Sequence, residues 1–255
     1  MPLEIFTIPC LNDNYAFVAH DAGSGETALV DVPEAAPILA VLKQRGWTLS
    51  HVLLTHHHPD HVQGLNEVLT MHPAKVVGAA ADAHRLPPLD MAVAEGDTVQ
   101  VGGEIGHVLD VSGHTVGHIA FHFPESRAVF TADSLMALGC GRLFEGTPAQ
   151  MWNSLSKLAA LPSDTVVYSG HEYTEANGSF AQTVDPDNPD LAARIKDIAE
   201  ARARSEPTVP SLLSLELATN PFLRATDPRV QENVGMSGAD PVDAFAEIRK
   251  RKDRF

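Results

Sequence analysis

The sequence contains few cysteines, few basic side chains and no long apolar run. Its two cysteines, Cys10 and Cys140, are too few for a disulfide framework, which weakly favours a reducing, cytoplasmic setting. The sequence contains 18 Lys and Arg residues and 33 Asp and Glu residues, so the net charge is -15. This charge argues against a general surface for nucleic acid or anionic membrane, since phosphate binding needs clustered cations. An anionic ligand would therefore need a local basic patch.

The chain also has neither a leader pattern nor a membrane-spanning pattern. No basic segment followed by an apolar segment opens the sequence, and nowhere do about 18 apolar residues follow one another. We therefore expect a soluble, unexported, cytoplasmic protein with no nucleic-acid or membrane partner, and we expect a monomer. With 255 residues, of which 44% are hydrophobic, the chain has room for one core domain and a smaller appendage.

Short β-type segments separated by Gly, Pro and Asp dominate the chain as far as His171. They are predicted at residues 4–9, 16–20, 27–32, 52–55, 76–78, 105–111, 119–123, 128–132 and 165–169. Helical patterns interrupt them at residues 35–45, 65–71 and 148–160. This alternation predicts an α/β sandwich of sheets flanked by helices.

The pattern changes after His171, because β-type segments nearly vanish there. Helix-forming stretches follow at residues 191–205, 211–218 and 241–252, the last of them opened by Asp240 and Pro241. We therefore place a domain boundary after residue 173. Residues 1–173 would form the α/β domain, and residues 174–255 a helical C-terminal domain.

Four histidines and an aspartate lie within residues 55–61, directly after a predicted apolar strand. In an extended segment His56 and His58 point to the same side, and the turn after Pro59 re-aims Asp60 and His61. Imidazole and carboxylate are ligands that suit Zn²⁺, Fe or Mn. A His-rich surface loop is the alternative, but this density at a strand end favours a metal site.

Three further segments place polar side chains just beyond predicted strands, with His114, Asp133 and His171 as their candidate ligands. Each segment alone would be an ordinary turn, but the ends of several strands are expected to converge at one edge of the sheet. Asp31 is either a turn residue or a side chain that orients ligands. His118 is expected beside the ligands and not among them. Cys140 is not expected to be the nucleophile, because a nucleophilic cysteine would need an activating base and the metal already provides a hydroxide.

The pattern His56-x-His58-x-Asp60-His61, followed by His114, Asp133 and His171, resembles the two-metal form of the metallo-β-lactamase superfamily. The resemblance implies an αββα sandwich, here with a helical C-terminal domain. It implies that His56, His58 and His114 hold one divalent metal ion, that Asp60, His61 and His171 hold the other, and that Asp133 bridges them. Zinc is the expected metal, and the same ligands accept iron or manganese.

Four segments beyond the ligands resemble the glyoxalase II family of hydroxyacylglutathione hydrolases, and the similarity covers essentially the whole chain. They are residues 12–15, 140–147, 170–174 and 220–224. The resemblance implies that Arg249 and Lys252 on the last helix hold the glycine carboxylate of glutathione, with Tyr173 and Arg142 contacting the rest of the peptide. Some family members have Lys at position 142 and Tyr in place of Phe144, so contacts at these two positions are open. A solvated basic tail is the alternative for the last helix.

The family reaction converts an S-(2-hydroxyacyl)glutathione, chiefly S-D-lactoylglutathione, and water into glutathione and a 2-hydroxy acid, the second step of methylglyoxal degradation. Asp60 and Asp133 would be the carboxylates beside the attacking hydroxide. The alternatives from the same superfamily are a mononuclear iron glutathione persulfide dioxygenase and another hydrolase, such as a zinc β-lactamase or a lactonase. A binding module without turnover is disfavoured by the intact ligand set.

Overall fold

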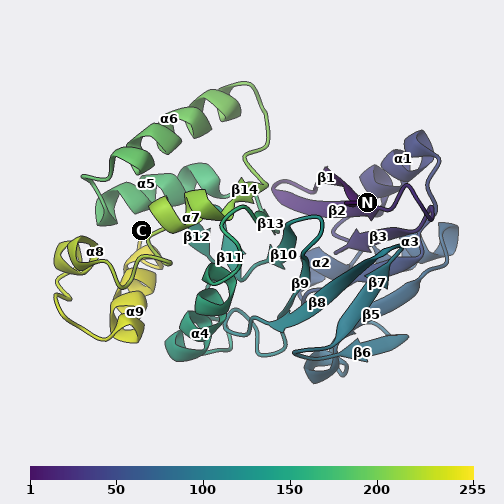
Figure 1. Cartoon of the computed structure of the whole chain (residues 1–255), viewed down its shortest axis with the longest axis horizontal. Coiled ribbons are helices and arrows are strands. Elements are labelled where there is room, and N and C mark those ends of the chain that lie inside the picture. Colours follow the sequence, from purple (N-terminus) through teal and green to yellow (C-terminus); the bar gives the residue numbers. More distant parts are fainter. The chain divides into compact units, whose positions relative to one another are not determined.

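The computed structural model of the protein describes residues 1–255 and divides them into two compact units. Unit 1 comprises Met1–Asp110 and Val116–Ala132, and unit 2 comprises Val111–Thr115 and Asp133–Phe255. Figure 1 shows unit 1 in purple to teal and most of unit 2 in green to yellow.

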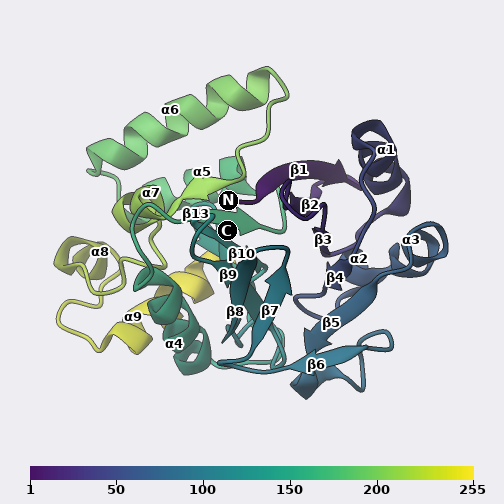
Figure 2. The same ribbon diagram turned by 45° about the vertical axis from the view of Figure 1, so that its right-hand side comes forward.

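The first sheet of unit 1 has the strand order β1-β2-β3-β4-β5-β6. Its strands are β1 (Glu4–Cys10), β2 (Asn14–His20), β3 (Thr27–Val30), β4 (His51–Leu53), β5 (Lys75–Ala79) and β6 (Met91–Val93). The β1–β2 and β2–β3 pairs are antiparallel, whereas β3, β4, β5 and β6 run parallel. Parallel strands require crossover connections. Helix α1 (Ala35–Arg45) lies between β3 and β4, the pair α2 (Pro59–Val62) and α3 (Leu65–Met71) between β4 and β5, and the 3-10 helix η1 (Ala80–Asp82) between β5 and β6. Figure 2 shows α1 and α3 together on one side of this sheet.

The second sheet of unit 1 is an antiparallel meander of β7 (Thr98–Val101), β8 (Glu104–Asp110), β9 (Ile119–Phe123) and β10 (Ala128–Ala132). Strands β2, β9 and β10 are buried at every residue, so both of their faces are covered. Phe17 on β2 contacts Phe130 on β10 with ring centroids 5.7 Å apart. The core of unit 1 therefore lies between its two sheets, which confirms the predicted α/β sandwich.

Unit 2 is mainly helical. A short hairpin of β11 (Leu135–Met136) and β12 (Gly139–Cys140) precedes α4 (Pro148–Ala159), and β13 (Val166–Ser169) pairs with β14 (Ser211–Leu212). The remaining helices are α5 (Thr174–Val184), α6 (Pro189–Ala203), α7 (Leu213–Thr219), α8 (Pro228–Asn233) and α9 (Pro241–Lys252), with α5 and α6 side by side in Figures 1 and 2.

Local capping explains where the helices of unit 2 begin. Thr147 forms a capping box with Gln150. Asn188 and Asp227 each accept two backbone N–H groups of the helix that follows, and Asp240 accepts one. In all four helices proline follows the cap, where its missing N–H costs nothing. The predicted helices at 35–45, 65–71 and 241–252 are confirmed at both ends.

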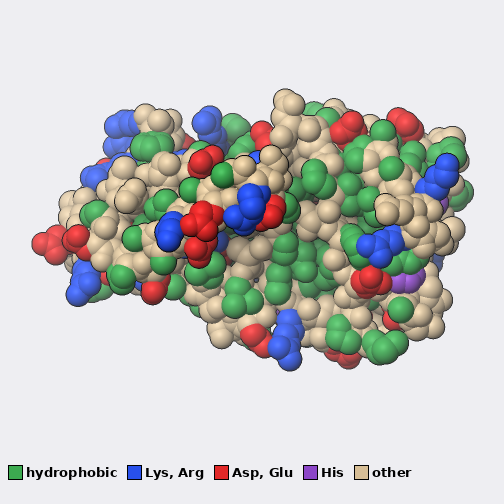
Figure 3. Space-filling view, turned by 90° about the horizontal axis from the view of Figure 1, so that it is seen from above, with side chains coloured by type: hydrophobic (Ala, Val, Ile, Leu, Met, Phe, Trp, Pro, Cys, Tyr) green, Lys and Arg blue, Asp and Glu red, His purple; other side chains and the backbone are tan.

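On the face drawn in Figure 3, the Lys and Arg side chains lie among Asp and Glu side chains and form no continuous basic surface. This distribution follows from the excess of acidic residues in the sequence. No helix of the protein is both long enough and apolar enough to cross a membrane.

Candidate metal centre and substrate-binding residues

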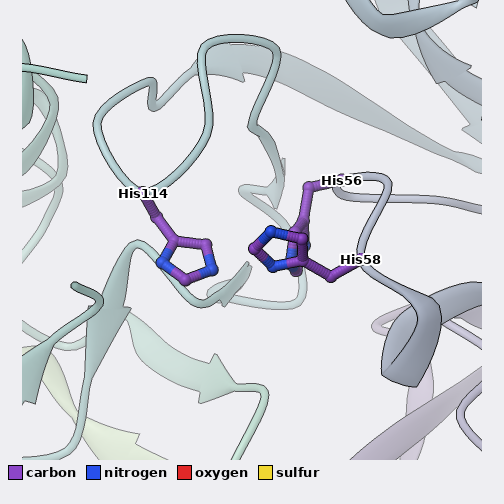
Figure 4. Close-up of side chains that lie close together, drawn as sticks. All are labelled: His56, His58 and His114. Carbon is purple, nitrogen blue, oxygen red and sulfur yellow. The ribbon is translucent and has the colours of Figure 1, made fainter. Parts of the chain in front are cut away.

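The histidine cluster of unit 1 lies in the connection between β4 and α2. Pro59 occupies the first turn of α2, so the chain changes direction immediately after His58. His56 Nε2 lies 3.1 Å from His58 Nδ1, and the ring of His56 lies 4.2 Å from that of His61. Figure 4 shows His56 and His58 on this connection, with their rings adjacent. His56 and His61 are fully buried, whereas the Asp60 side chain is 41% exposed.

Asp31 fixes the orientation of this cluster. Its carboxylate is 3% exposed and accepts three hydrogen bonds, from Thr55 N (2.9 Å), Thr55 Oγ1 (2.7 Å) and His61 Nδ1 (2.8 Å). Since the Thr55 hydroxyl donates to Asp31, it accepts from His56 Nδ1 at 3.1 Å. Of the two roles expected for Asp31, the structure therefore supports the orientation of ligands.

Two further side chains hold the cluster, and neither contact was predicted from the sequence. Asn14, which is 5% exposed, donates through Nδ2 to both the backbone oxygen (3.1 Å) and Oδ2 (3.0 Å) of Asp60. The fully buried Asp82 lies 3.1 Å from His57 Nδ1. His118 stacks on His56, one of the predicted ligands, with centroids 4.6 Å apart. Asn14 belongs to a segment noted only for its resemblance, and Asp82 lies 25 residues from its partner.

Unit 2 brings together the other three predicted ligands. Asp133 is 6% exposed, and its two carboxylate oxygens lie 3.5 Å from His114 Nε2 and 3.3 Å from His171 Nε2. His114 Nδ1 lies 2.8 Å from the Arg142 backbone oxygen. A Cβ atom at Gly141 would lie 2.0 Å from the Asp133 backbone oxygen and 2.8 Å from His114 Nδ1, so no larger residue fits there. Figure 4 shows His114 on the loop that carries it.

The protonation of these rings fits a bound cation. The Arg142 carbonyl and the Asp31 carboxylate can only accept, so His114 and His61 both carry their proton on Nδ1. In a neutral imidazole the lone pair then lies on Nε2, which in each case is directed towards a carboxylate oxygen, at 3.5 Å for His114 and 3.8 Å for His61. A lone pair facing an anion is repulsive, and a bound cation between the two would remove this repulsion. The donor set therefore suits divalent metal ions.

Exposed aromatic rings cover the two histidines of unit 2. The Tyr173 ring, 40% exposed, stacks on His171 at 4.7 Å with an interplanar angle of 8°. Phe144, 63% exposed, lies with its centroid 5.2 Å from that of His114. Cys140 is unsuited to nucleophilic attack, because burial raises the pKa of its thiol to about 11 although Arg249 opposes the shift. Its thiol therefore stays protonated.

The basic residues of α9 differ in accessibility. Arg249 is 5% exposed and donates through Nη1 to the Cys140 backbone oxygen at 2.9 Å, while its Nε and Nη2 contact Asp253. Lys252 is half-buried, with Nζ 3.2 Å from the Ala176 backbone oxygen. Burial, followed by the nearby cations Arg249 and Arg142, lowers the pKa of Lys252 to about 8 against the opposing effect of Asp253.

Comparison with known proteins identifies the family. Residues 14–171 match the metallo-β-lactamase superfamily, and residues 172–255 match the family described as hydroxyacylglutathione hydrolase C-terminus. The chain is 67% identical to a hydroxyacylglutathione hydrolase of Ruegeria pomeroyi and 64% identical to one of Roseobacter denitrificans, over 100% of each chain. The chain belongs to the hydroxyacylglutathione hydrolase family. The family resemblance read from the sequence is thereby confirmed.

Solved structures confirm the fold of this family member. A B3 metallo-β-lactamase, BLEG-1, aligns with a TM-score of 0.67 at 20% identity, covering 86% of this chain and 99% of its own. The protein TTHA1623, solved in a di-iron-bound form, aligns with a TM-score of 0.60 at 26% identity, covering 86% of this chain and 100% of its own. The metallo-β-lactamase fold with clustered His and Asp side chains indicates a binuclear metal site in this hydroxyacylglutathione hydrolase family member.

Proposed function

We propose that the protein hydrolyses S-(2-hydroxyacyl)glutathione thioesters, chiefly S-D-lactoylglutathione, to glutathione and a 2-hydroxy acid such as D-lactate. The observation that carries this proposal is the identity of 52–67% with hydroxyacylglutathione hydrolases over the full chain, C-terminal region included. The fold alone would not suffice, because it hosts several unrelated reactions. The reaction would be the second step of methylglyoxal degradation.

We assign the metal ligands as the superfamily pattern implies. One ion would be held by His56, His58 and His114, the other by Asp60, His61 and His171, with Asp133 shared between them. The Nδ1 protonation of His61 and His114 supports this assignment, since each leaves Nε2 available to a metal. The di-iron form of TTHA1623 supports two ions. Zinc is the metal we propose, and iron or manganese would fit the same donors.

When bound, the two ions would lower the pKa of a water molecule towards about 7 and polarise the thioester carbonyl. The chain would supply the positioning. We assign to Asp60 the orientation of the attacking hydroxide, and its hydrogen bonds from Asn14 together with its partly exposed side chain support this assignment. The leaving thiol has an ordinary pKa near 8.5, so glutathione departs as thiolate without a dedicated acid.

We assign glutathione binding to Arg142, Tyr173, Arg249 and Lys252. Residues 1–173 would form the catalytic domain, and residues 174–255 would form the domain that contributes Arg249 and Lys252. The exposure of Arg142 and Tyr173 supports direct contact with substrate. Phe144 cannot donate a hydroxyl hydrogen bond, so its exposed ring would contribute apolar contact only.

We also propose a cytoplasmic monomer. Both cysteines are buried free thiols, as a reducing compartment favours. All the proposed ligands and binding residues belong to one chain, so catalysis would need no second subunit. Sedimentation velocity of the purified protein tests the monomer, and a stable dimer would contradict it.

The decisive experiment compares substrates on one metal-loaded preparation. We expect hydrolysis of S-D-lactoylglutathione, followed as loss of the thioester absorbance, to be much faster than hydrolysis of a penicillin or a lactone. Chelated protein is the control for metal dependence. Oxygen consumption with glutathione persulfide at a rate comparable to thioester hydrolysis would instead place the protein with the dioxygenases.

A further inference from the structure

The segment Cys140–Arg142 links α9 to His114. At its first residue the Cys140 backbone oxygen accepts a hydrogen bond from Arg249 Nη1 at 2.9 Å. At its last residue the Arg142 backbone oxygen accepts the Nδ1 proton of His114 at 2.8 Å. The hydrogen bond that sets the tautomer of His114 is thus two residues from the carbonyl that Arg249 holds.

Arg249 is itself held in one orientation. Its Nε and Nη2 contact Asp253 at 3.0 and 2.8 Å, and its guanidinium lies 5.0 Å from the centroid of the Phe222 ring. Only 5% of the residue is exposed. A planar guanidinium fixed on two sides donates to Cys140 from a set position, which an ammonium group on a flexible stem would not do.

The segment has little freedom to absorb a displacement. Gly141 packs so closely against the Asp133 backbone and the His114 ring that a Cβ atom would overlap both. On the other side, Asn220 Nδ2 donates to the Gly139 backbone oxygen at 3.0 Å. A shift at Cys140 would therefore be passed on to the Arg142 carbonyl.

We propose that Arg249 is a positioning residue for His114, acting through the backbone of Cys140–Arg142. The effect of this role on catalysis rests on the proposed function. The role is additional to the glutathione binding assigned to Arg249 above. It predicts that loss of Arg249 weakens metal binding and lowers kcat, in addition to raising KM. Lys252, three residues further along α9, contacts the Ala176 backbone oxygen and the rings of Phe180 and Phe255, so its loss should affect KM alone.

The test compares Arg249→Met with the native protein, because methionine keeps an unbranched side chain but removes every donor. Zinc affinity is measured by competition with a chelator, and the exchange of the His114 Nδ1 proton with solvent is measured by NMR on the zinc-loaded chain. We expect zinc affinity and kcat to fall about tenfold, the low end for loss of a group that orients a ligand, with faster proton exchange. Removing a nearby positive charge would by itself strengthen zinc binding, so a loss has the opposite sign to the electrostatic effect.

The controls lie on the same helix. Lys252→Met should keep native zinc affinity and kcat, and Lys250→Met, which removes an exposed cation, should keep all three parameters. Arg249→Lys keeps a cationic donor group but loses the planar fork that reaches Cys140 and Asp253 together, and it should give an intermediate zinc affinity. Should Arg249→Met fail to fold, a weakening of about threefold in Arg249→Lys supports the proposal.

Native zinc affinity together with native exchange of the His114 proton would overturn the proposal. If Arg249→Met folds, this result in Arg249→Met overturns the proposal. If Arg249→Met does not fold, the same result in Arg249→Lys overturns it. Neither measurement uses a thioester, so this failure is distinguishable from failure of the proposed function.

Discussion

Lys252 gives the proposed glutathione site a pH dependence that can be calculated. Burial and the cations Arg249 and Arg142 lower the pKa of Lys252 to about 8, whereas an ordinary lysine titrates near 10.4. The charged form predominates below pH 8 and is lost as the pH rises, so binding of a carboxylate weakens above pH 8. If only the charged form binds, kcat/KM should fall about tenfold between pH 7 and pH 9, whereas a lysine of ordinary pKa would change it by a few per cent.

The same shift predicts the opposite trend for stability. Because the folded state holds this proton less tightly than the unfolded state, the free energy of unfolding should rise with pH between about 8 and about 10.4. A denaturant series at pH 8 and pH 10 in the native protein and in Lys252→Met separates this contribution from that of other groups.

The assay measures initial rates of thioester hydrolysis across pH 6.5–9.5, corrected for spontaneous hydrolysis. A glutathione thioester lacking the glycine carboxylate is the control, since its profile contains every other titration and should lack the limb near pH 8. A ratio of the two substrates that stays constant to pH 9.5 would refute the assignment of Lys252 to the carboxylate.

Two further predictions concern the metal ligands. Asp31→Asn keeps the size of the side chain but removes the carboxylate that accepts from His61 Nδ1, so zinc affinity should fall about 10- to 100-fold in chelator competition, and an unchanged affinity would contradict the orienting role. Asp133→Ala should lower the zinc content at both positions in elemental analysis, whereas His57→Ala should leave it nearly native, and two ions retained in Asp133→Ala would exclude a shared ligand.

Local signals explain which elements the sequence predicted well. Helices α1 and α9 were predicted at both ends, because apolar side chains recur at helical spacing along the first and Asp240 with Pro241 opens the second. Helix α5 was missed. No side chain caps it, and its sequence contains a glycine and several weak helix formers, so its stability comes from burial of residues such as Phe180.

In the site too, some features were predicted from the sequence and others were not. Its candidate ligands follow strands or turns that the sequence marks, so they were predicted as a set. The hydrogen bonds of Asn14 to Asp60 and of Arg249 to Cys140 join residues 46 and 109 positions apart. Pairings at such separations depend on the packing of whole elements, which no local pattern records.

Gly141 restricts how the substrate preference of such a chain can change. The neighbouring exposed positions 142 and 144 can vary in size and charge, because their side chains project from the segment. Even alanine at position 141 would displace the backbone of Asp133 or the ring of His114. Attempts to redesign this loop for other thioesters should therefore vary its flanking positions and keep the central glycine. A substitution of Gly141 would damage the metal site before it could change the specificity.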